Sequence, residues 1–213
     1  MTDQEFPTIH YLPPLDRQPS HLSRKDVVAR CLEPGLSRDS LEPFVKKCAA
    51  RDFLRPVGID AADKRAPYLY EIDSVLIAKC LHTLAFASIE VDGPDGIGRA
   101  VSLAMKSFAV EDHFPNGVPK GENVNAYFRA FGPSPAAWAI LDYRRGVTGW
   151  SLHVAATLDD AGKKRVGAKL WNVQNGFMPN LFGRPEPVIP HAETVLSLDR
   201  ILPIILGDRE GMN

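Results

Sequence analysis

The sequence is poor in cysteine and has no long apolar run, and each absence excludes a class of protein. Among its 213 residues are only three cysteines, and no two of them form a CxxC pair. Zinc sites and disulfide frameworks use closer spacings or an even number of cysteines. We therefore predict that Cys31, Cys48 and Cys80, each on an apolar helical stripe, pack as small buried side chains. No segment approaches the roughly 18 apolar residues of a membrane span, so we expect no contact with a membrane.

The N-terminal segment lacks the features of a signal peptide. Acidic residues precede its first Lys or Arg, and no apolar run follows. Pro13 and Pro14 predict an extended arm over residues 1–19. We therefore expect a cytoplasmic protein.

Familiar catalytic and cofactor motifs are also missing. The sequence has no GxSxG, HExxH, Walker or GxGxxG pattern, and residues 92–98, although rich in glycine, predict a turn. Its six histidines are scattered without the spacing of a metal site. His153 falls on the polar face of a predicted strand, and nothing in the sequence places Asp159, Asp160 and Glu193 together as an acid–base pair. We expect no enzyme activity, no cofactor and no metal.

The charge balance is near neutral over the whole chain but uneven along it. Lys and Arg number 25 against 26 Asp and Glu, a net charge of −1. Residues 17–70 hold eleven basic and seven acidic side chains, which gives +4 and leaves −5 for the remainder. This polarity predicts two modules, of which the basic one is the candidate for nucleic-acid contact.

Two short helices joined by a tight turn are predicted in the basic part. A capping box at Ser23 predicts the start of a helix over residues 24–32, and the Glu-Pro-Gly sequence of residues 33–35 ends it. A second helix over residues 38–51 follows, capped by Ser37. Two helices connected in this way are typical of a helix-turn-helix.

The solvent face of the second helix is the candidate DNA-reading surface. Its polar side chains lie opposite an apolar stripe, as a recognition helix requires. Residues 55–60 and 65–70 then predict two strands around a polar turn, a wing that lies along the phosphate backbone. We predict base contacts from Arg38, Ser40 or Arg51 and phosphate contacts from Lys25, Lys46, Lys47, Lys64 and Arg65.

The features around these elements follow a recognisable order. They are Leu36-Ser37 before the second helix, Phe53-Leu54-Arg55-Pro56 at the entry to the wing, Arg65 with Tyr68 and Tyr70 in its second strand, and Asp73 after it. Asp73 or Ser74 is the predicted cap of a further helix that carries Val75 to Leu84. With them, residues 20–90 resemble a MerR-type winged helix-turn-helix. The resemblance implies a domain that binds duplex DNA.

Pro43 departs from that pattern. Inside a helix it removes one hydrogen bond, which leaves two alternatives open. Either the second helix begins late, with Glu42 as cap and Pro43 in its first turn, or it is kinked. The base contacts assigned to Arg38 and Ser40 depend on the outcome.

Residues 91–213 predict a second, α+β module. An amphipathic helix from Ile97 to about Val110 packs either inside the chain or on a second copy. Basic residues at two predicted hairpin turns, 144–145 and 163–165, either extend the DNA surface or are solvated charges, and we favour the second interpretation. The other predicted elements are a loop at 112–123, a turn at 159–162, strands at 138–143, 150–155, 165–171 and 193–198, and a short terminal helix at 199–206.

The predicted fold class is therefore α+β, an N-terminal winged helix-turn-helix over residues 20–90 followed by helices and a small antiparallel sheet over residues 91–213. The first hypothesis is a DNA-binding transcriptional regulator whose C-terminal module forms a homodimer, binds a small-molecule effector or contacts another protein. The second is a non-enzymatic interaction or assembly factor that uses the winged helix as a docking module. The third is an enzyme acting through the C-terminal sheet.

Overall fold

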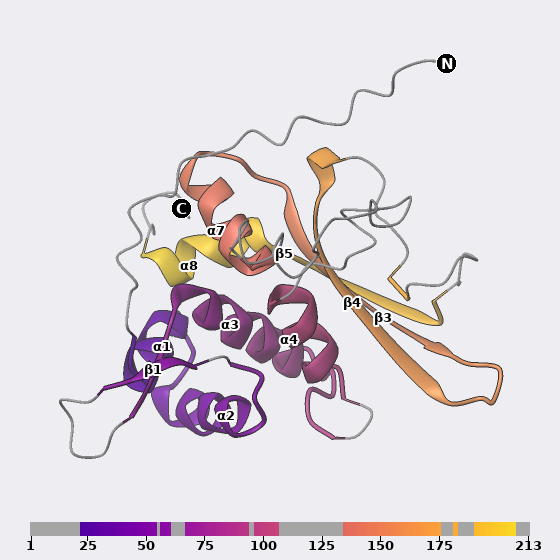
Figure 1. Cartoon of the computed structure of the whole chain (residues 1–213), viewed down its shortest axis with the longest axis horizontal. Coiled ribbons are helices and arrows are strands. Elements are labelled where there is room, and N and C mark those ends of the chain that lie inside the picture. Colours follow the sequence, from indigo (N-terminus) through magenta and orange to yellow (C-terminus); the bar gives the residue numbers. More distant parts are fainter. Residues whose placement is uncertain are drawn as a thin grey trace, which may run out of the picture.

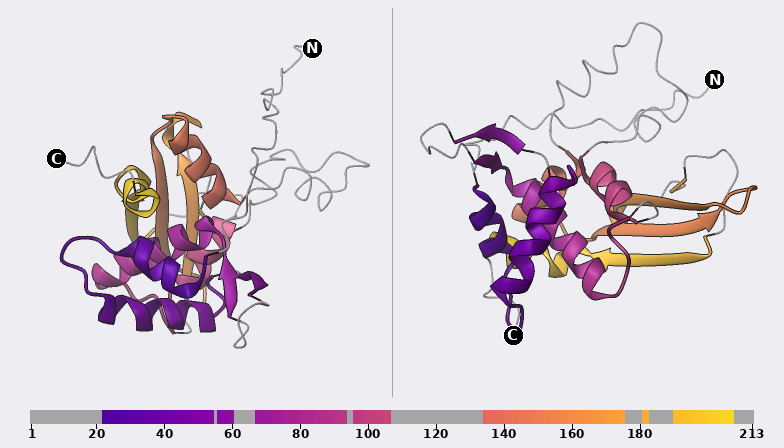
Figure 2. Two further views of the ribbon diagram at one scale, coloured as in Figure 1. Left: turned by 90° about the vertical axis from the view of Figure 1, so that its left-hand side faces the viewer. Right: turned by 90° about the horizontal axis from the view of Figure 1, so that it is seen from below.

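A computed structural model describes residues 22–54, 56–60, 67–93, 96–106, 134–175, 181–182 and 190–207. Within these ranges, helices and two antiparallel sheets form an α+β fold, as predicted. The helices gather at one end of the longer sheet, and the β3–β4 hairpin of that sheet projects away from them (Figures 1 and 2). The predicted arm at 1–19, the loop at 112–123 and the wing residues Lys64 and Arg65 lie outside the described residues.

The first two helices begin where the sequence predicts. α1 (Arg24–Cys31) opens on a capping box, in which the Ser23 hydroxyl accepts from the Asp26 amide and the Asp26 carboxylate accepts from the Ser23 amide at 2.8 Å. α2 (Arg38–Ala50) opens on Ser37, whose hydroxyl accepts a backbone amide of the first turn. These bonds satisfy amides that have no partner within the helix.

Pro43 lies inside α2, not at its start. The helix runs through it from Arg38, so the alternative of a late start with Glu42 as cap is wrong. Because proline has no amide hydrogen, the Asp39 carbonyl loses its partner four residues on. Asp39 lies on the exposed side of the helix, where water can take the place of that partner.

The predicted hairpin follows α2 and is tied back to the start of α1. β1 (Pro56–Ile59) and β2 (Tyr68–Tyr70) pair antiparallel. On the other side of β2, Tyr70 forms a bridge with Leu22, in which each amide donates to the other residue's carbonyl at 2.8 Å. The residue that precedes α1 is thereby fixed to the strand that leads into the next helix.

α3 (Ile72–Phe86) is the central helix of the core. Nine of its residues are buried, because α1, α2, α4, α7 and α8 all pack on it. The prediction that Asp73 or Ser74 caps this helix is wrong, since the cap position is Glu71. Ser74 is buried, and the Asp73 carboxylate accepts from the Ser134 hydroxyl at 3.1 Å.

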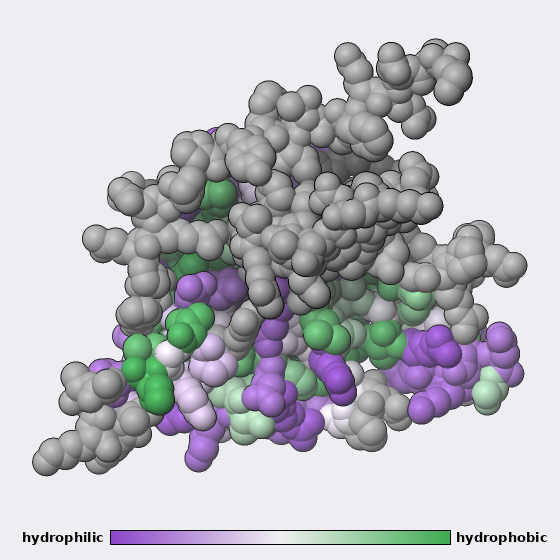
Figure 3. Space-filling view, viewed as in Figure 1, coloured by the Kyte–Doolittle hydropathy of each residue, from purple (hydrophilic) through white to green (hydrophobic). Residues whose placement is uncertain are grey.

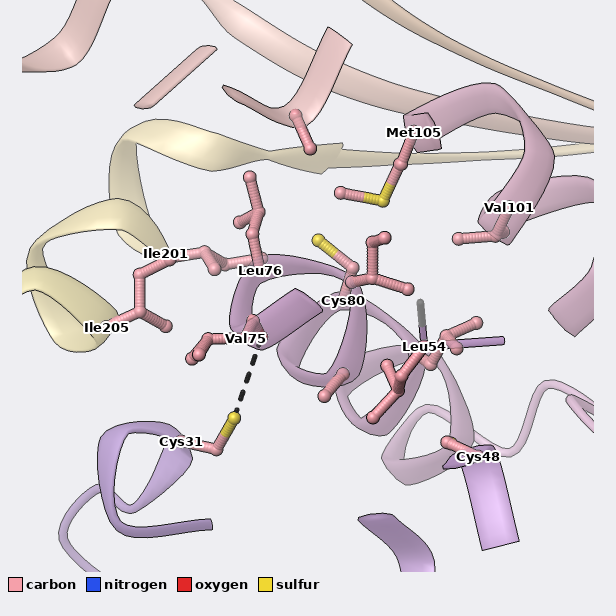
Figure 4. Packing of buried hydrophobic residues seen from close by; sticks show 14 of the residues in the cluster. Cys31, Cys48, Leu54, Val75, Leu76, Cys80, Val101, Met105, Ile201 and Ile205 are labelled. Atoms are coloured by element: carbon pink, nitrogen blue, oxygen red, sulfur yellow. Dashed lines mark hydrogen bonds between the residues drawn. The ribbon is translucent and has the colours of Figure 1, made fainter. Parts of the chain in front are cut away.

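The three cysteines are buried around α3, as predicted (Figure 4). The Cys31 thiol donates to the Val75 carbonyl of α3 at 3.6 Å. Burial raises the pKa of Cys31 and of Cys48 to about 12, and it also raises the pKa of Cys80. All three thiols are therefore protonated at neutral pH.

α4 (Gly98–Lys106) lies within the predicted amphipathic helix. Its stripe, Val101 and Met105 with Ile97 just before it, is buried in the chain's own core. The helix packs on α3 and on the sheet strand β4. Of the two alternatives for this stripe, packing inside the chain is therefore the one that the structure shows.

α7 (Pro135–Arg144) replaces the predicted strand at 138–143, which is wrong. Ser134 caps the helix by accepting from the Ala137 amide at 3.1 Å, and Pro135 occupies the first turn, where its fixed backbone angle favours a helix. The apolar run that suggested a strand is the buried side and flank of this short helix. In this segment the helix cap of Ser134 and Pro135, rather than the run of apolar residues, determines the secondary structure.

The longer sheet has the strand order β4-β3-β5. Its strands are β3 (Trp150–Leu158), β4 (Lys164–Asn172) and β5 (Ala192–Ser197), all antiparallel. The strands predicted near 150–155, 165–171 and 193–198 are therefore confirmed, as is the turn at 159–162, where Gly162 has a φ of +73°. The hairpin partner of β3 is β4 and not the segment 138–143.

The last described elements of the chain pack against the helices. A 3-10 turn, η2 (Leu198–Arg200), leads into α8 (Leu202–Leu206), close to the predicted terminal helix. The Arg30 side chain of α1 donates to the Ile205 carbonyl at 3.2 Å. The buried apolar residues form one cluster that extends from Leu22 to Ile205.

Candidate nucleic-acid interface

α2 presents a mixed polar face to solvent. Its buried residues Leu41, Val45 and Cys48 lie on one side, which leaves the predicted contact residues on the other. Figure 3 shows hydrophilic and apolar surface mixed on the α2 side of the molecule, and a mostly hydrophilic tip on the β3–β4 hairpin. The exposed charges of α2 and its C-cap are basic at Arg38, Lys46, Lys47 and Arg51 and acidic at Asp39 and Glu42.

The hydroxyl of Ser40 is used within the first turn of α2. It donates to the Ser37 carbonyl at 2.9 Å, and the Ser37 hydroxyl in turn donates to it at 3.1 Å. The Ser40 hydroxyl therefore contributes first to the start of the helix. The other two predicted base-contacting residues, Arg38 in the first turn of α2 and Arg51 at its C-cap, are exposed.

Two of the predicted basic contacts are paired with an acid that sequence reasoning did not connect to them. The Lys47 ammonium forms an ion pair with Asp92 Oδ2, and Arg51 Nε lies 3.5 Å from Asp92 Oδ1. All three side chains are partly exposed. Asp92 follows α3 in a glycine-rich turn, and no spacing rule places that turn beside the end of α2.

Lys25 lies in the first turn of α1, next to the capping box. It is exposed, as are Arg38 and Lys46. The hydrogen bond from the Ser23 hydroxyl lowers the pKa of the neighbouring Asp26, and the bond from the Ser23 amide lowers it further. The Asp26 carboxylate is thus committed to the cap, although its charge partly offsets that of Lys25.

The β1–β2 hairpin carries apolar side chains on its outer surface. Ile59 and Tyr68 are direct cross-strand neighbours and are both exposed, and so is Val57. Apolar cross-strand pairs stabilise a two-stranded ribbon even in contact with water. The prediction of a basic wing named Tyr68 in the second wing strand but gave no role to Val57 or Ile59.

A buried ammonium group lies behind the turn between α1 and α2. Lys79 of α3 is only 1% exposed, and its Nζ lies 2.5 Å from Glu33 Oε1 and donates to the Cys31 carbonyl at 3.1 Å. Glu33 belongs to the Glu-Pro-Gly turn and is 38% exposed. A buried charge therefore fixes this turn on α3.

A cavity of about 270 Å³ opens beside this ion pair. On its α3 side, His82 packs edge-on against Phe44 of α2, with ring centroids 5.3 Å apart. Burial lowers the pKa of His82, and the nearby Lys79 charge lowers it further. The residues lining the cavity are Glu33, Pro34, Gly35, Leu36, His82, Thr83 and Phe86.

The candidate groups of the C-terminal half form separate pairs. Asp159 accepts from Arg165 Nε at 3.2 Å. The backbone amide of Lys163 lowers the pKa of Asp159 most, and the bond from Arg165 lowers it further. Glu193 lies beside His153 at 3.1 Å. The acids at 159–160 and Glu193 therefore do not meet. Among the described residues no group of three or more His, Cys, Asp or Glu is arranged to hold a metal ion.

The two basic turns of this half lie at opposite ends of β3. The turn at 144–145 precedes Trp150, whereas residues 163–165 adjoin Leu158 at the far end of the strand. A nine-residue strand separates them by roughly 26 Å at about 3.3 Å per residue. This separation means that the two turns do not form one continuous basic patch.

Comparison with models of protein families, with curated proteins and with solved structures gives no match to the chain. In the described part of the chain, no helix is long and apolar enough to cross a membrane.

Proposed function

We propose that this protein is a transcriptional regulator that binds duplex DNA through a winged helix-turn-helix formed by α1, α2 and the β1–β2 hairpin. The observation that carries the proposal is the bridge between Leu22 and Tyr70. It joins the segment before α1 to the hairpin and so makes one unit of the two helices and the wing. A helix-turn-helix places its second helix in the major groove, and the bridge joins the hairpin to the same unit.

The charge of α2 supports the same function. Four basic and two acidic side chains are exposed on the helix and its C-cap. Lysine and arginine side chains of this kind bind phosphates without reading sequence. The sheet and α8 then form the module that links DNA binding to a second copy, an effector or a partner protein.

The proposal is tested with the full chain and a fluorescent mixed-sequence duplex, by anisotropy at several salt concentrations. Wild-type protein is expected to bind at about 50 mM salt and to weaken steeply as salt rises. The double variant Lys46→Ala with Lys47→Ala is expected to weaken binding and to flatten the slope of log affinity against log salt by about one unit per lost phosphate contact.

A matched control is the double variant Lys163→Ala with Lys164→Ala, which removes the same charge from the exposed tip of the β3–β4 hairpin. It is expected to keep most of the wild-type affinity. Equal losses in the two double variants would mean that α2 has no special part in binding. Absence of wild-type binding at low salt would contradict the proposal.

The exposed apolar surface of the hairpin favours a second candidate, a protein-docking module. Ile59 and Tyr68 would then contact a partner protein instead of the DNA backbone. This candidate predicts that Ile59→Ser with Tyr68→Ser removes cross-linked complexes formed in a cell extract and leaves duplex affinity unchanged. Loss of duplex affinity in the same variant would favour the DNA-binding function.

A further inference from the structure

One face of the longer sheet carries a hydrogen-bonded row of a serine, a histidine and a glutamate. Successive side chains of a strand point to opposite faces, and Leu152 and Val154 of β3 point into the core. Ser151 and His153 therefore share the other face. Glu193 of β5 lies on the same face, because its direct partner on β3 is Ala155, two residues along from His153.

The distances join these groups into a relay. Ser151 Oγ lies 2.9 Å from His153 Nε2, and His153 Nδ1 lies 3.1 Å from Glu193 Oε1. A carboxylate only accepts hydrogen bonds, so Nδ1 must be the ring nitrogen that carries the proton. When the ring carries only this proton, Nε2 is an acceptor, and the Ser151 hydroxyl donates to it. The Trp171 carbonyl is the competing acceptor for this single hydroxyl proton, at the longer distance of 3.5 Å.

A serine that donates to a histidine oriented by a carboxylate is the arrangement that activates a nucleophile. The histidine takes the hydroxyl proton as the oxygen attacks, and the carboxylate fixes the ring's orientation and tautomer. The relay joins adjacent strands of one sheet at fixed spacing. It is therefore preorganised without a loop having to close.

The neighbouring strand places a positive charge beside the relay. Lys169 of β4 is the direct partner of His153, and Trp171 is the direct partner of Ser151. The Lys169 ammonium lies 5.8 Å from the centre of the Trp171 ring. A cation on this face favours the negative charge that develops on an acyl oxygen during attack.

Exposure along the row limits the size of the electrophile. Ser151 is 7% exposed, whereas the side chains of His153 and Glu193 are 16% and 39% exposed. The row is therefore most exposed at its glutamate end and least exposed at its serine end. Such limited exposure of the serine favours a small reactive group over a large one.

We propose that Ser151, His153 and Glu193 form a nucleophilic site that accepts small acyl groups from activated carboxylic esters, an activity separate from DNA binding. Ser151 Oγ forms a bond to the acyl carbon, its proton passes to His153 Nε2, and the carbonyl π electrons move to the acyl oxygen. The bond to the alcohol then breaks, and the alcohol leaves with the proton from Nε2. Water attacks the acyl-serine, its proton passes through Nε2 to Ser151 Oγ, and the carboxylic acid is released.

The test is covalent labelling of the full-length protein with a small alkyl fluorophosphonate, located by mass spectrometry of the peptides. Ser151 Oγ forms a bond to phosphorus, fluoride leaves, and Nε2 takes up the proton. Wild-type protein is expected to carry one label, on Ser151. Ser151→Ala is expected to lose it. Ser197→Ala, which changes the exposed cross-strand neighbour of Ser151 on β5, is expected to be labelled like wild type.

The two partners of the nucleophile are tested by labelling rate. His153→Gln is expected to slow labelling by about 100-fold or more, the contribution of a general base. Glu193 is a positioning residue, so Glu193→Gln is expected to lower the maximal labelling rate without changing the probe concentration at half-saturation. Glu193→Asp is expected to restore part of that rate.

Three results would overturn the proposal. The first is wild-type protein that stays unlabelled, a result that does not depend on whether any variant folds. The second is a label on a residue other than Ser151. The third is a His153→Gln variant that is labelled as fast as wild type. Duplex binding by the same preparations is measured in parallel, so failure of this site is distinguishable from failure of the DNA-binding function.

Discussion

In the described helices the buried polar side chains include the ammonium of Lys79, whereas in the sheet they are the neutral side chains of Ser151, Thr157 and Asn172. Lys79 depends on one carboxylate supplied by a distant turn. The sheet groups bond to neighbours on their own or adjoining segments. A helix interior thus tolerates a charge only where another segment brings its counter-charge. A sheet face holds a whole row of polar groups because strand spacing supplies partners.

The largest expected effect comes from removing that counter-charge. Glu33→Ala leaves the Lys79 ammonium buried with the Cys31 carbonyl as its remaining bond in the structure, and it is expected to lower the free energy of unfolding by about 3–5 kcal/mol. Lys79→Met removes the charge itself and leaves Glu33 where water reaches it. Its expected cost is about 1–3 kcal/mol, mainly for the unpaired carbonyl.

Chemical denaturation of both variants measures this asymmetry. A loss in Lys79→Met equal to or greater than that in Glu33→Ala would mean that the ammonium is not confined as the structure has it. The contrast between the two parts of the molecule would then disappear, because neither would bury a charge.

A smaller effect is expected where a helical charge lies at the surface. Asp92→Asn releases Lys47 and Arg51 from their shared carboxylate. If α2 binds phosphates, duplex affinity is expected to rise by about 1.4- to 5-fold, because exposed ion pairs contribute only about 0.2–1 kcal/mol. Anisotropy measures the change, with Asp160→Asn at the hairpin tip as the control for net charge. Unchanged or weaker binding in Asp92→Asn would separate these two bases from the interface.

The smallest effect is expected from the half-buried ring of His82. Burial lowers its pKa in the folded state, so the unfolded chain binds the proton more tightly. Stability is therefore complete above the ordinary histidine pKa of about 6.5 and declines as pH falls below it. Denaturation at pH 7.5 and 5.5 is expected to show a smaller decline in His82→Gln than in wild type. The same decline in both would assign the acid sensitivity to another group.

The helical part of the fold followed largely from local signals. The Ser23 and Ser37 caps, the Glu-Pro-Gly turn and the apolar stripes determine α1 and α2, because helix boundaries are set within a few residues of sequence. The segment 138–143 was mistaken for a strand because an apolar run has no period of its own. The serine and proline that cap α7 were the local signal that resolves the ambiguity.

The site residues also divide into those that a local sequence signal predicts and those that depend on contacts between distant segments. The exposure of Arg38, Lys46 and Lys47 follows from helical periodicity and was predicted. The pairing of Lys47 with Asp92 joins positions 45 residues apart, and that of His153 with Glu193 joins positions 40 residues apart. Such contacts depend on which segments pack together, and one sequence has no local signal for that choice. Among the contacts of these sites, only the one between Ser151 and His153 follows from a local signal, because residues two positions apart on a strand share one face.

The bond between Arg30 and the Ile205 carbonyl spans 175 positions of the chain and has a consequence for synthesis on the ribosome. α8 packs on both α1 and α3, so the surfaces that it covers wait for the last described helix to emerge. At about 5–20 residues per second, that interval is roughly 9–35 s. During this time the nascent helices carry an uncovered apolar seam, which is the kind of surface that chaperones bind.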